Sequence, residues 1–169
     1  MKKLLIAALA AVLVAASAFA QDGKSIYNKY SGKNGVESVY ISPAMFKMVG
    51  QLPELSVAVD SGDGTIDIAP ILKSLDGMYI LSSTNQAVNS LMAADVADFV
   101  KKNKFELLMD AKDGEETVSM YTLHDKKEAD FLNGFLMIST EPGESTFIYI
   151  AGTMSRSDFE ALMSSAMGK

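Results

Sequence analysis

The sequence of 169 residues contains no cysteine, no tryptophan and one histidine, His124. Without cysteine the chain forms no disulfide and has no residue on which a bacterial lipoprotein would carry its lipid. Zinc sites draw on several cysteines and histidines, so a single histidine argues against one. A serine hydrolase would need His124 as its general base, but no serine stands in a Gly-x-Ser-x-Gly turn. We therefore expect His124 to be an edge residue in a polar turn.

Residues 1–20 have the order of a secretory signal peptide. Lys2 and Lys3 precede an unbroken apolar run over 4–16, and Ala18-Phe19-Ala20 places small residues before the expected cut. The run is shorter than the roughly 20 apolar residues of a membrane-spanning helix. We expect cleavage after Ala20, a periplasmic or secreted protein, and no membrane anchor after cleavage.

Acidic residues outnumber basic ones, 21 to 15, which gives a formal net charge of −6. Two of the basic residues and none of the acidic ones lie in 1–20, so residues 21–169 carry thirteen basic and 21 acidic side chains, a net charge of −8. This balance argues against nucleic acid or an anionic membrane as partner. Residues 21–169 are long enough to bury a core of their own, and we expect a single globular α+β domain.

Hydrophobic periodicity and turn signals predict the order β-α-β-α-β-β-β-β-α. Asp113-Gly114 and Pro142-Gly143 indicate tight turns, and strands joined by tight turns are antiparallel. The predicted fold is an antiparallel or mixed sheet of five to six strands with two longer helices packed on one face. The predicted strands are 36–41, 78–82, 105–111, 117–123, 132–140 and 146–151. The predicted helices are 44–49, one capped by Thr84 or Asn85, and one that begins at Ser155 or Ser157.

Other segments are less regular. Residues 21–34 indicate a short amphipathic helix or an ordered arm, 51–64 a surface loop, and Asp76-Gly77 a turn. Apolar stripes are expected to bury the two longer helices. The first stripe is Val88, Leu91, Met92, Val96, Phe99 and Val100, and the second is Phe159, Leu162, Met163, Ala166 and Met167.

The last predicted hairpin is apolar on both faces, because large apolar residues follow one another without polar alternation. The face opposite the helices must then be covered by 43–75, by the N-terminal arm, or by a second copy of the chain. We expect the partner to be another protein or a second copy. The candidate binding surface is Phe147, Ile148, Tyr149 and Ile150.

The sequence gives little support for a metal or cofactor site, and we predict none. Asp60, Asp63 and Asp67 fail the EF-hand spacing, because a glycine at the sixth position would put a valine first. The pairs Met45-x-x-Met48 and Met163-x-x-x-Met167 could offer soft copper ligands, but core packing or a methionine-lined groove for an apolar or peptide partner explains them better. No pair of acids is singled out as catalytic, and no glycine-rich phosphate loop is present.

Several short stretches carry a family resemblance: Ile26-Tyr27-Asn28-Lys29-Tyr30, Gly35-Val36-Glu37-Ser38-Val39-Tyr40-Ile41-Ser42, Met45-Phe46-Lys47-Met48 and Phe105-Glu106-Leu107-Leu108-Met109. With the leader, these resemble the domain-of-unknown-function family 4252 (DUF4252). The resemblance implies a small exported protein of Bacteroides-type Gram-negative bacteria, where some members are lipid-anchored. This chain departs from the anchored members in lacking cysteine. The family offers no catalytic residue to transfer.

Three functions remain open from the sequence. The leading hypothesis is a non-enzymatic binding or protein-interaction module, because catalytic side chains are few and the last hairpin is apolar on both faces. An alternative is a carboxylate-dependent hydrolase that acts on glycan or peptide, which a deep cleft with convergent carboxylates would favour. Another alternative is a periplasmic regulatory partner of a membrane signalling protein.

Overall fold

The computed structural model describes residues 23–51, 56–58, 65–67, 69–124, 131–158 and 160. The helices are α2 (Lys24–Tyr30), α3 (Pro43–Val49), α4 (Ala69–Lys73) and α5 (Gln86–Asn103). The strands are β1 (Val36–Ile41), β2 (Ser56–Ala58), β3 (Thr65–Asp67), β4 (Leu75–Ser83), β5 (Glu106–Asp113), β6 (Glu116–His124), β7 (Phe131–Glu141) and β8 (Glu144–Ser155). None of the described helices is long and apolar enough to cross a membrane.

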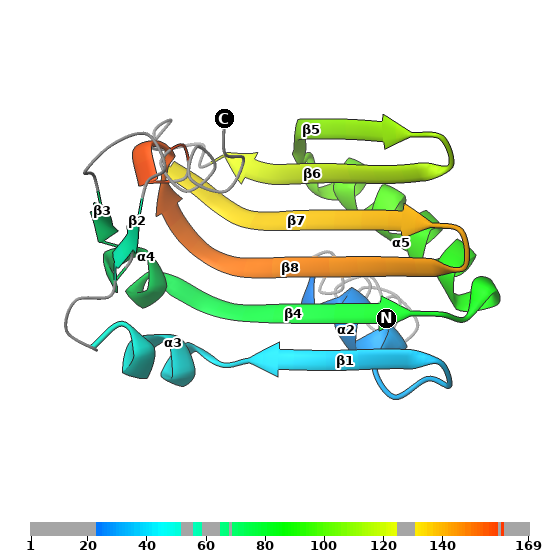
Figure 1. Cartoon of the computed structure of the whole chain (residues 1–169), viewed down its shortest axis with the longest axis horizontal. Coiled ribbons are helices and arrows are strands. Elements are labelled where there is room, and N and C mark those ends of the chain that lie inside the picture. Colours follow the sequence, from blue (N-terminus) through cyan, green and yellow to red (C-terminus); the bar gives the residue numbers. More distant parts are fainter. Residues whose placement is uncertain are drawn as a thin grey trace, which may run out of the picture.

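Six strands form one sheet in the order β1-β4-β8-β7-β6-β5 (Figure 1). Each neighbouring pair is antiparallel. The chain therefore has the predicted α+β fold, with a sheet that is antiparallel throughout. Strands β2 and β3 pair only with each other, as a short separate ribbon.

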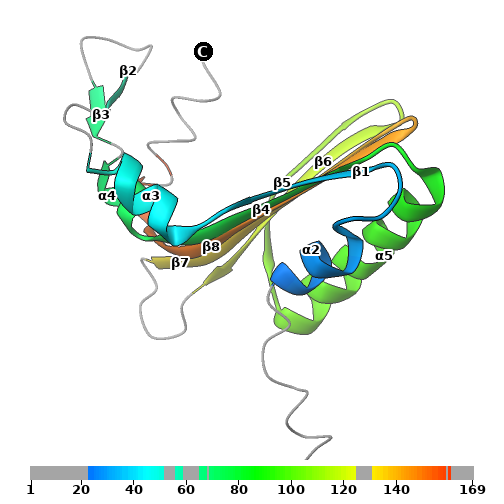
Figure 2. The same ribbon diagram turned by 90° about the horizontal axis from the view of Figure 1, so that it is seen from below.

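The two faces of the six-stranded sheet differ in what covers them. Helices α2 and α5 pack on one face, which we call the helix face (Figure 2). Helices α3 and α4 lie at one end of the strands, toward the other side of the sheet (Figure 2). We call that other side the open face. The predicted N-terminal arm is thus α2, and it covers the helix face.

The core lies between the sheet and α5. Buried residues alternate with exposed or partly exposed ones along β4 and along β8 as far as Ile150, so every second side chain there points toward the helices. Leu81 and Phe147 have no exposed surface, and Met92 of α5 packs with them. The core residues are Ile26, Tyr30, Tyr79, Leu81, Val88, Met92, Val96, Phe99, Leu136, Phe147 and Tyr149.

The helix starts predicted from the sequence are confirmed. Asn85 caps α5, and its Oδ1 accepts hydrogen bonds from the amides of Ala87 and Val88. Ser42 caps α3 through the amide of Met45, and Pro43 occupies the first turn, where its missing amide costs nothing. After β8, residues 156–158 are helical. The rest of the predicted C-terminal stripe lies outside the described residues.

Three local predictions need correction. The expected loop at 51–64 contains β2, which pairs with β3. Asp76-Gly77 makes no turn, because β4 runs through it and absorbs the extra residue as a bulge opposite Ala151 and Gly152. Leu91 is 60% exposed, since α5 buries a narrower stripe than its sequence suggests.

Candidate interaction surface

The open face is defined by strand register. Side chains that are paired across neighbouring antiparallel strands point to the same side of the sheet. On β4 the residues at 77, 79, 81 and 83 are buried, which leaves Met78 and Ile80 on the open face. Ile148 pairs with Ile80 and with Met137, so β8 and β7 continue the same surface.

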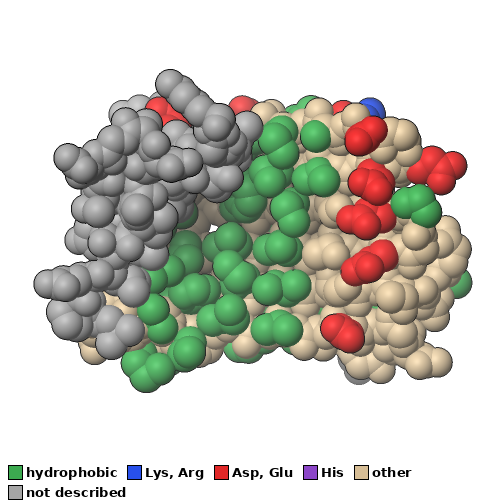
Figure 3. Space-filling view, in the orientation of Figure 1, with side chains coloured by type: hydrophobic (Ala, Val, Ile, Leu, Met, Phe, Trp, Pro, Cys, Tyr) green, Lys and Arg blue, Asp and Glu red, His purple; other side chains and the backbone are tan. Residues whose placement is uncertain are grey.

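Apolar side chains extend across all six strands on this face, and we call them the apolar field. Figure 3 shows them as a continuous group on the side away from α2 and α5. Val39 is half exposed, and the others are partly exposed. Five strand spacings of about 4.8 Å make the field about 24 Å wide. Its members are Val39, Ile41, Met78, Ile80, Met109, Val118, Met120, Phe135, Met137, Ile148 and Ile150.

A line of carboxylates borders the field at the end where the β5–β6 and β7–β8 turns lie (Figure 3). Asp113 pairs directly with Glu116, and Glu141 with Glu144. The register of Thr117 with Thr140, carried one residue further, sets Glu116 beside Glu141. With Glu37 on β1 these residues form what we call the acidic row, and all five are exposed.

The acidic row works against the stability of the sheet, because like charges directly opposite each other on neighbouring strands repel. Ser82 donates a hydrogen bond to Glu144 at 2.9 Å. The ion pairs that join two described residues are Lys29–Asp95, Lys102–Asp98 and Lys112–Asp110, and none of these includes a member of the row. Apart from the hydrogen bond of Ser82, none of these contacts stabilises the charges gathered in the row.

At the opposite end of the field α3 forms an apolar hollow of about 610 Å³. Ile41 belongs to the field and also lines the hollow. Phe46 and Met45 of α3 both line the hollow, and Phe46 is buried whereas Met45 is 45% exposed. The lining residues are Tyr40, Ile41, Ser42, Met45, Phe46, Val49 and Leu72.

The candidate surface predicted from the sequence is divided between the two faces. Phe147 and Tyr149 are buried in the core beneath the helices. Ile148 and Ile150 lie on the open face. Successive residues of a strand point to opposite sides, so four consecutive residues cannot share a surface.

Of the predicted methionine pair Met45 and Met48, only one lies at the hollow. Met45 lines the hollow, whereas Met48 is 59% exposed and does not line it. Met163 and Met167 lie outside the described residues, as do Asp60 and Asp63. Strand β6 ends at His124, as expected, but its side chain is outside the description.

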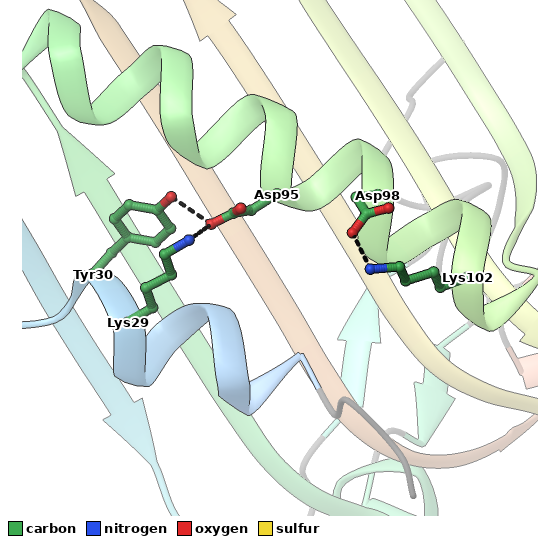
Figure 4. A network of polar contacts seen from close by, with 5 residues as sticks. All are labelled: Lys29, Tyr30, Asp95, Asp98 and Lys102. Atoms are coloured by element: carbon green, nitrogen blue, oxygen red, sulfur yellow. Dashed lines mark hydrogen bonds and ion pairs between the residues drawn. The ribbon is translucent and has the colours of Figure 1, made fainter. Parts of the chain in front are cut away.

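A polar network joins α2 to α5 on the helix side (Figure 4). The Tyr30 hydroxyl donates to Asp95 at 2.6 Å, and Lys29 Nζ lies 2.5 Å from the same Asp95 oxygen. Burial, together with the hydrogen bond to Asp95, raises the pKa of Tyr30 well above its usual value. Burial alone would raise the pKa of Asp95, but hydrogen bonds from Lys29 and Tyr30 outweigh it and lower that pKa.

This network has the chemistry of a structural tie. Tyr30 is held as a neutral donor and Asp95 as an ionised acceptor, so neither is poised to exchange a proton near neutral pH. On the same helix Asp98 pairs with Lys102 at 2.6 Å (Figure 4). Within the described residues no group of three or more His, Cys, Asp or Glu could hold a metal ion.

Sequence reasoning missed the acidic row, although a signal for it exists. Asp113 and Glu116 flank one tight turn, and Glu141 and Glu144 flank the next but one. In a meander, alternate turns lie at the same end of the sheet. Acidic residues that flank alternate turns therefore come together, which the order of the strands alone could have indicated.

Comparison with known families places the chain. The model of the domain of unknown function DUF4252 matches residues 30–162. The chain belongs to the DUF4252 family. The match begins at Tyr30, the last residue of α2, and includes all the strands of the six-stranded sheet. Both the apolar field and the hollow therefore fall within this DUF4252 domain. No curated protein and no solved structure matches the chain.

Proposed function

We propose that this protein is an exported, non-enzymatic binding module that docks a protein partner on the open face of its sheet. The apolar field carries this proposal. Soluble proteins seldom leave continuous apolar patches of more than a few hundred Å² in water, and larger ones mark interaction sites. Here apolar side chains from all six strands share one face, while α2 and α5 cover the other.

The arrangement of the carboxylates supports binding over hydrolysis. A carboxylate-dependent hydrolase needs two acids that converge on a substrate within a cleft. The described hollow is apolar, and the acidic row lies at the other end of the sheet, where each of its members is exposed. The row fits the polar rim of an interface, which surrounds an apolar centre.

Photocrosslinking in the native envelope tests the proposal. A photoreactive residue at Met137, on the open face, should yield an adduct of defined mass with a second protein. The matched position is Leu91, which is 60% exposed on the outer side of α5 and should yield no such adduct. The adduct at Met137 should disappear when Ile148→Thr and Ile150→Thr are combined, because threonine keeps a strand-compatible branched side chain but is more polar.

Two results would contradict the proposal. One is an exported, folded protein that gives no adduct at Met137, and the other is an adduct that persists in the double threonine variant. The urea midpoint of that variant, measured beside the parent protein, separates lost binding from lost folding.

Export is part of the same proposal, and it rests on residues 1–20 and on the resemblance of the chain to exported proteins of Bacteroides-type bacteria. Mass spectrometry of the protein recovered from its envelope or medium should find an N-terminus at Gln21. A protein that retains Met1 in the cell interior would remove export from the proposal and leave the surface to be tested by itself.

A further inference from the structure

We infer that the occupant of the open face is a cationic amphipathic helix of the partner. It would cross the open face obliquely, from the hollow beside β1 to the carboxylates of β7 and β6, with its apolar stripe on the apolar field, one apolar side chain in the hollow, and lysine or arginine over the acidic row. This inference rests on the proposed function, and it names the chemistry of the partner.

Charge complementarity selects a basic partner. Four carboxylates stand on neighbouring strands, as Asp113 with Glu116 and Glu141 with Glu144, and Glu37 extends the row on β1. Repulsion within such a row falls when cationic groups approach it, so a basic partner gains attraction and also relieves the repulsion. None of the ion pairs between described residues includes a member of the acidic row, so its negative charge is left for cationic groups of a partner to balance.

The dimensions fit a short helix. Glu144 and Ile150 lie six residues apart on β8 and mark the two ends of the surface. Six residues of strand span about 20 Å, and three to four strand spacings of about 4.8 Å separate β1 from β7 and β6. The oblique path is about 26 Å long, which a helix of about 17 residues covers at 1.5 Å per residue. A helix that lies on a sheet also pairs its own backbone groups except those of its first and last turns, whereas an extended segment on this face would leave all of its backbone groups without partners.

The hollow supplies an anchor and a direction. Met45, Val49 and Leu72 line it with flexible or branched apolar side chains, a lining that admits a leucine, methionine or phenylalanine. Because the hollow and the acidic row lie at opposite ends of the field, a helix with its anchor at one end and its basic residues at the other binds in one direction.

Other occupants fit the charges less well. A second copy brings another acidic chain, with a net charge of −8 over residues 21–169, to a surface that is already acidic. Residues 159–169 of this chain contain an apolar stripe, but Lys169 is their one basic residue and Glu160 opposes it. Both occupants remain as outcomes of the test.

Peptide binding to the purified full chain, measured by fluorescence anisotropy, tests the inference. The probe is a helical peptide of about 17 residues with a leucine stripe, an anchor phenylalanine at one end and two lysines at the other. The matched probe has two glutamates in place of the lysines. At low salt we expect the cationic probe to bind at least tenfold more tightly, and at 1 M salt, where the Debye length is about 3 Å, we expect most of that difference to vanish.

Paired variants locate the contacts. Glu116→Gln with Glu141→Gln should weaken the cationic probe by roughly three- to tenfold at low salt, as expected for two surface charge pairs. Asp98→Asn with Glu160→Gln removes the same number of charges elsewhere and should leave binding unchanged. Met45→Asp should weaken the probe with the phenylalanine anchor more than a probe with alanine there.

Several results would overturn the inference. These are equal binding of the two probes, no binding of the cationic probe, or no effect of Glu116→Gln with Glu141→Gln. A dimer in sedimentation that Ile148→Thr with Ile150→Thr dissociates would give the face to a second copy. Binding that begins only after residues 159–169 are deleted would give it to the chain itself. An adduct at Met137 together with equal binding of both probes would retain the proposed function and reject only the cationic helix.

Discussion

The two faces of the sheet are made by the same strands and differ in what happens to their apolar side chains. On the helix face Leu81, Leu136 and Phe147 have no exposed surface, because α5 closes over them. On the open face their sequence neighbours Ile80, Met137 and Ile148 are partly exposed. The difference teaches that one face supplies the stability of the domain, while the other retains apolar area that a partner can bury.

Substitutions at two adjacent residues of β8 should give the largest difference in stability between the two faces. Phe147→Ala removes a fully buried ring and should lower the free energy of unfolding by about 3–5 kcal/mol. Ile148→Ala, one residue on, removes a side chain from the open face and should cost about 1 kcal/mol. Urea unfolding of both variants measures the contrast, and equal costs would mean that the open face is packed as tightly as the core.

A substitution where α2 contacts the sheet should have a smaller effect on the free energy of unfolding, again on the helix face. A β-carbon on Gly23 would lie 2.3 Å from the Tyr149 ring, so either the ring or the start of α2 must move. The φ of Gly23 is −51°, which any residue adopts, so the cost of Gly23→Ala is steric. We expect a loss of about 1–3 kcal/mol in urea unfolding. Ser25→Ala, at an exposed position of the same helix, is the control and should be nearly neutral.

The tie between α2 and α5 should depend on pH. Asp95→Asn removes the charge that Lys29 and Tyr30 contact, and we expect a loss of about 1 kcal/mol at neutral pH. The pKa of Asp95 is lowered in the folded protein. Its contribution is therefore complete above the ordinary aspartate pKa of about 3.9 and is lost as the pH falls through the lower folded value.

Thermal unfolding of the parent protein and Asp95→Asn between pH 7 and pH 3 checks this. The difference between the two should be constant down to about pH 5 and should shrink below about pH 4. A difference that grows as the pH falls would show that Asp95 does not act as an ionised partner of Lys29 and Tyr30. Asp98→Asn, which removes an exposed i,i+4 pair on the same helix, should change the stability by only a few tenths of a kcal/mol.

Local signals predicted much of this fold. Asn85 and Ser42 are side-chain caps that need only their neighbours, and Gly143 has the φ of +88° that a Pro-Gly turn requires. Asp76-Gly77 has the same local appearance as a turn, but pairing with β8 decides otherwise. Gly77 takes a φ of +150° within the bulge, and Gly152 opposite leaves no room for a β-carbon beside Ser74. A contact between distant strands overrides the local preference there.

The candidate surface needed distant contacts as well. The sequence indicated that both sides of the last hairpin are apolar, but it could not say which side α5 covers, so Phe147 and Ile148 were grouped together. The acidic row required the strand order, because Glu37 and Glu116 are far apart in the chain. The hollow required the placement of α3, whose Phe46 is buried and lines the hollow beside Ile41 of β1.

The smallest expected effect is a gain in stability on the open face. Glu116→Gln with Glu141→Gln removes like charges from neighbouring strands, so the free energy of unfolding should rise by about 0.2–1 kcal/mol at low salt. The gain should fade at 1 M salt, where screening has already weakened the repulsion in the parent protein. Thermal unfolding at the two salt concentrations measures it, and Asp98→Asn with Glu160→Gln serves as the control.

The variant Glu116→Gln with Glu141→Gln is also expected to bind the cationic probe less well, so a single pair of substitutions should move stability and binding in opposite directions. Such a trade-off is expected if carboxylates are placed for a partner at a cost to the fold. A variant that loses stability would instead mean that the row contributes to the sheet itself.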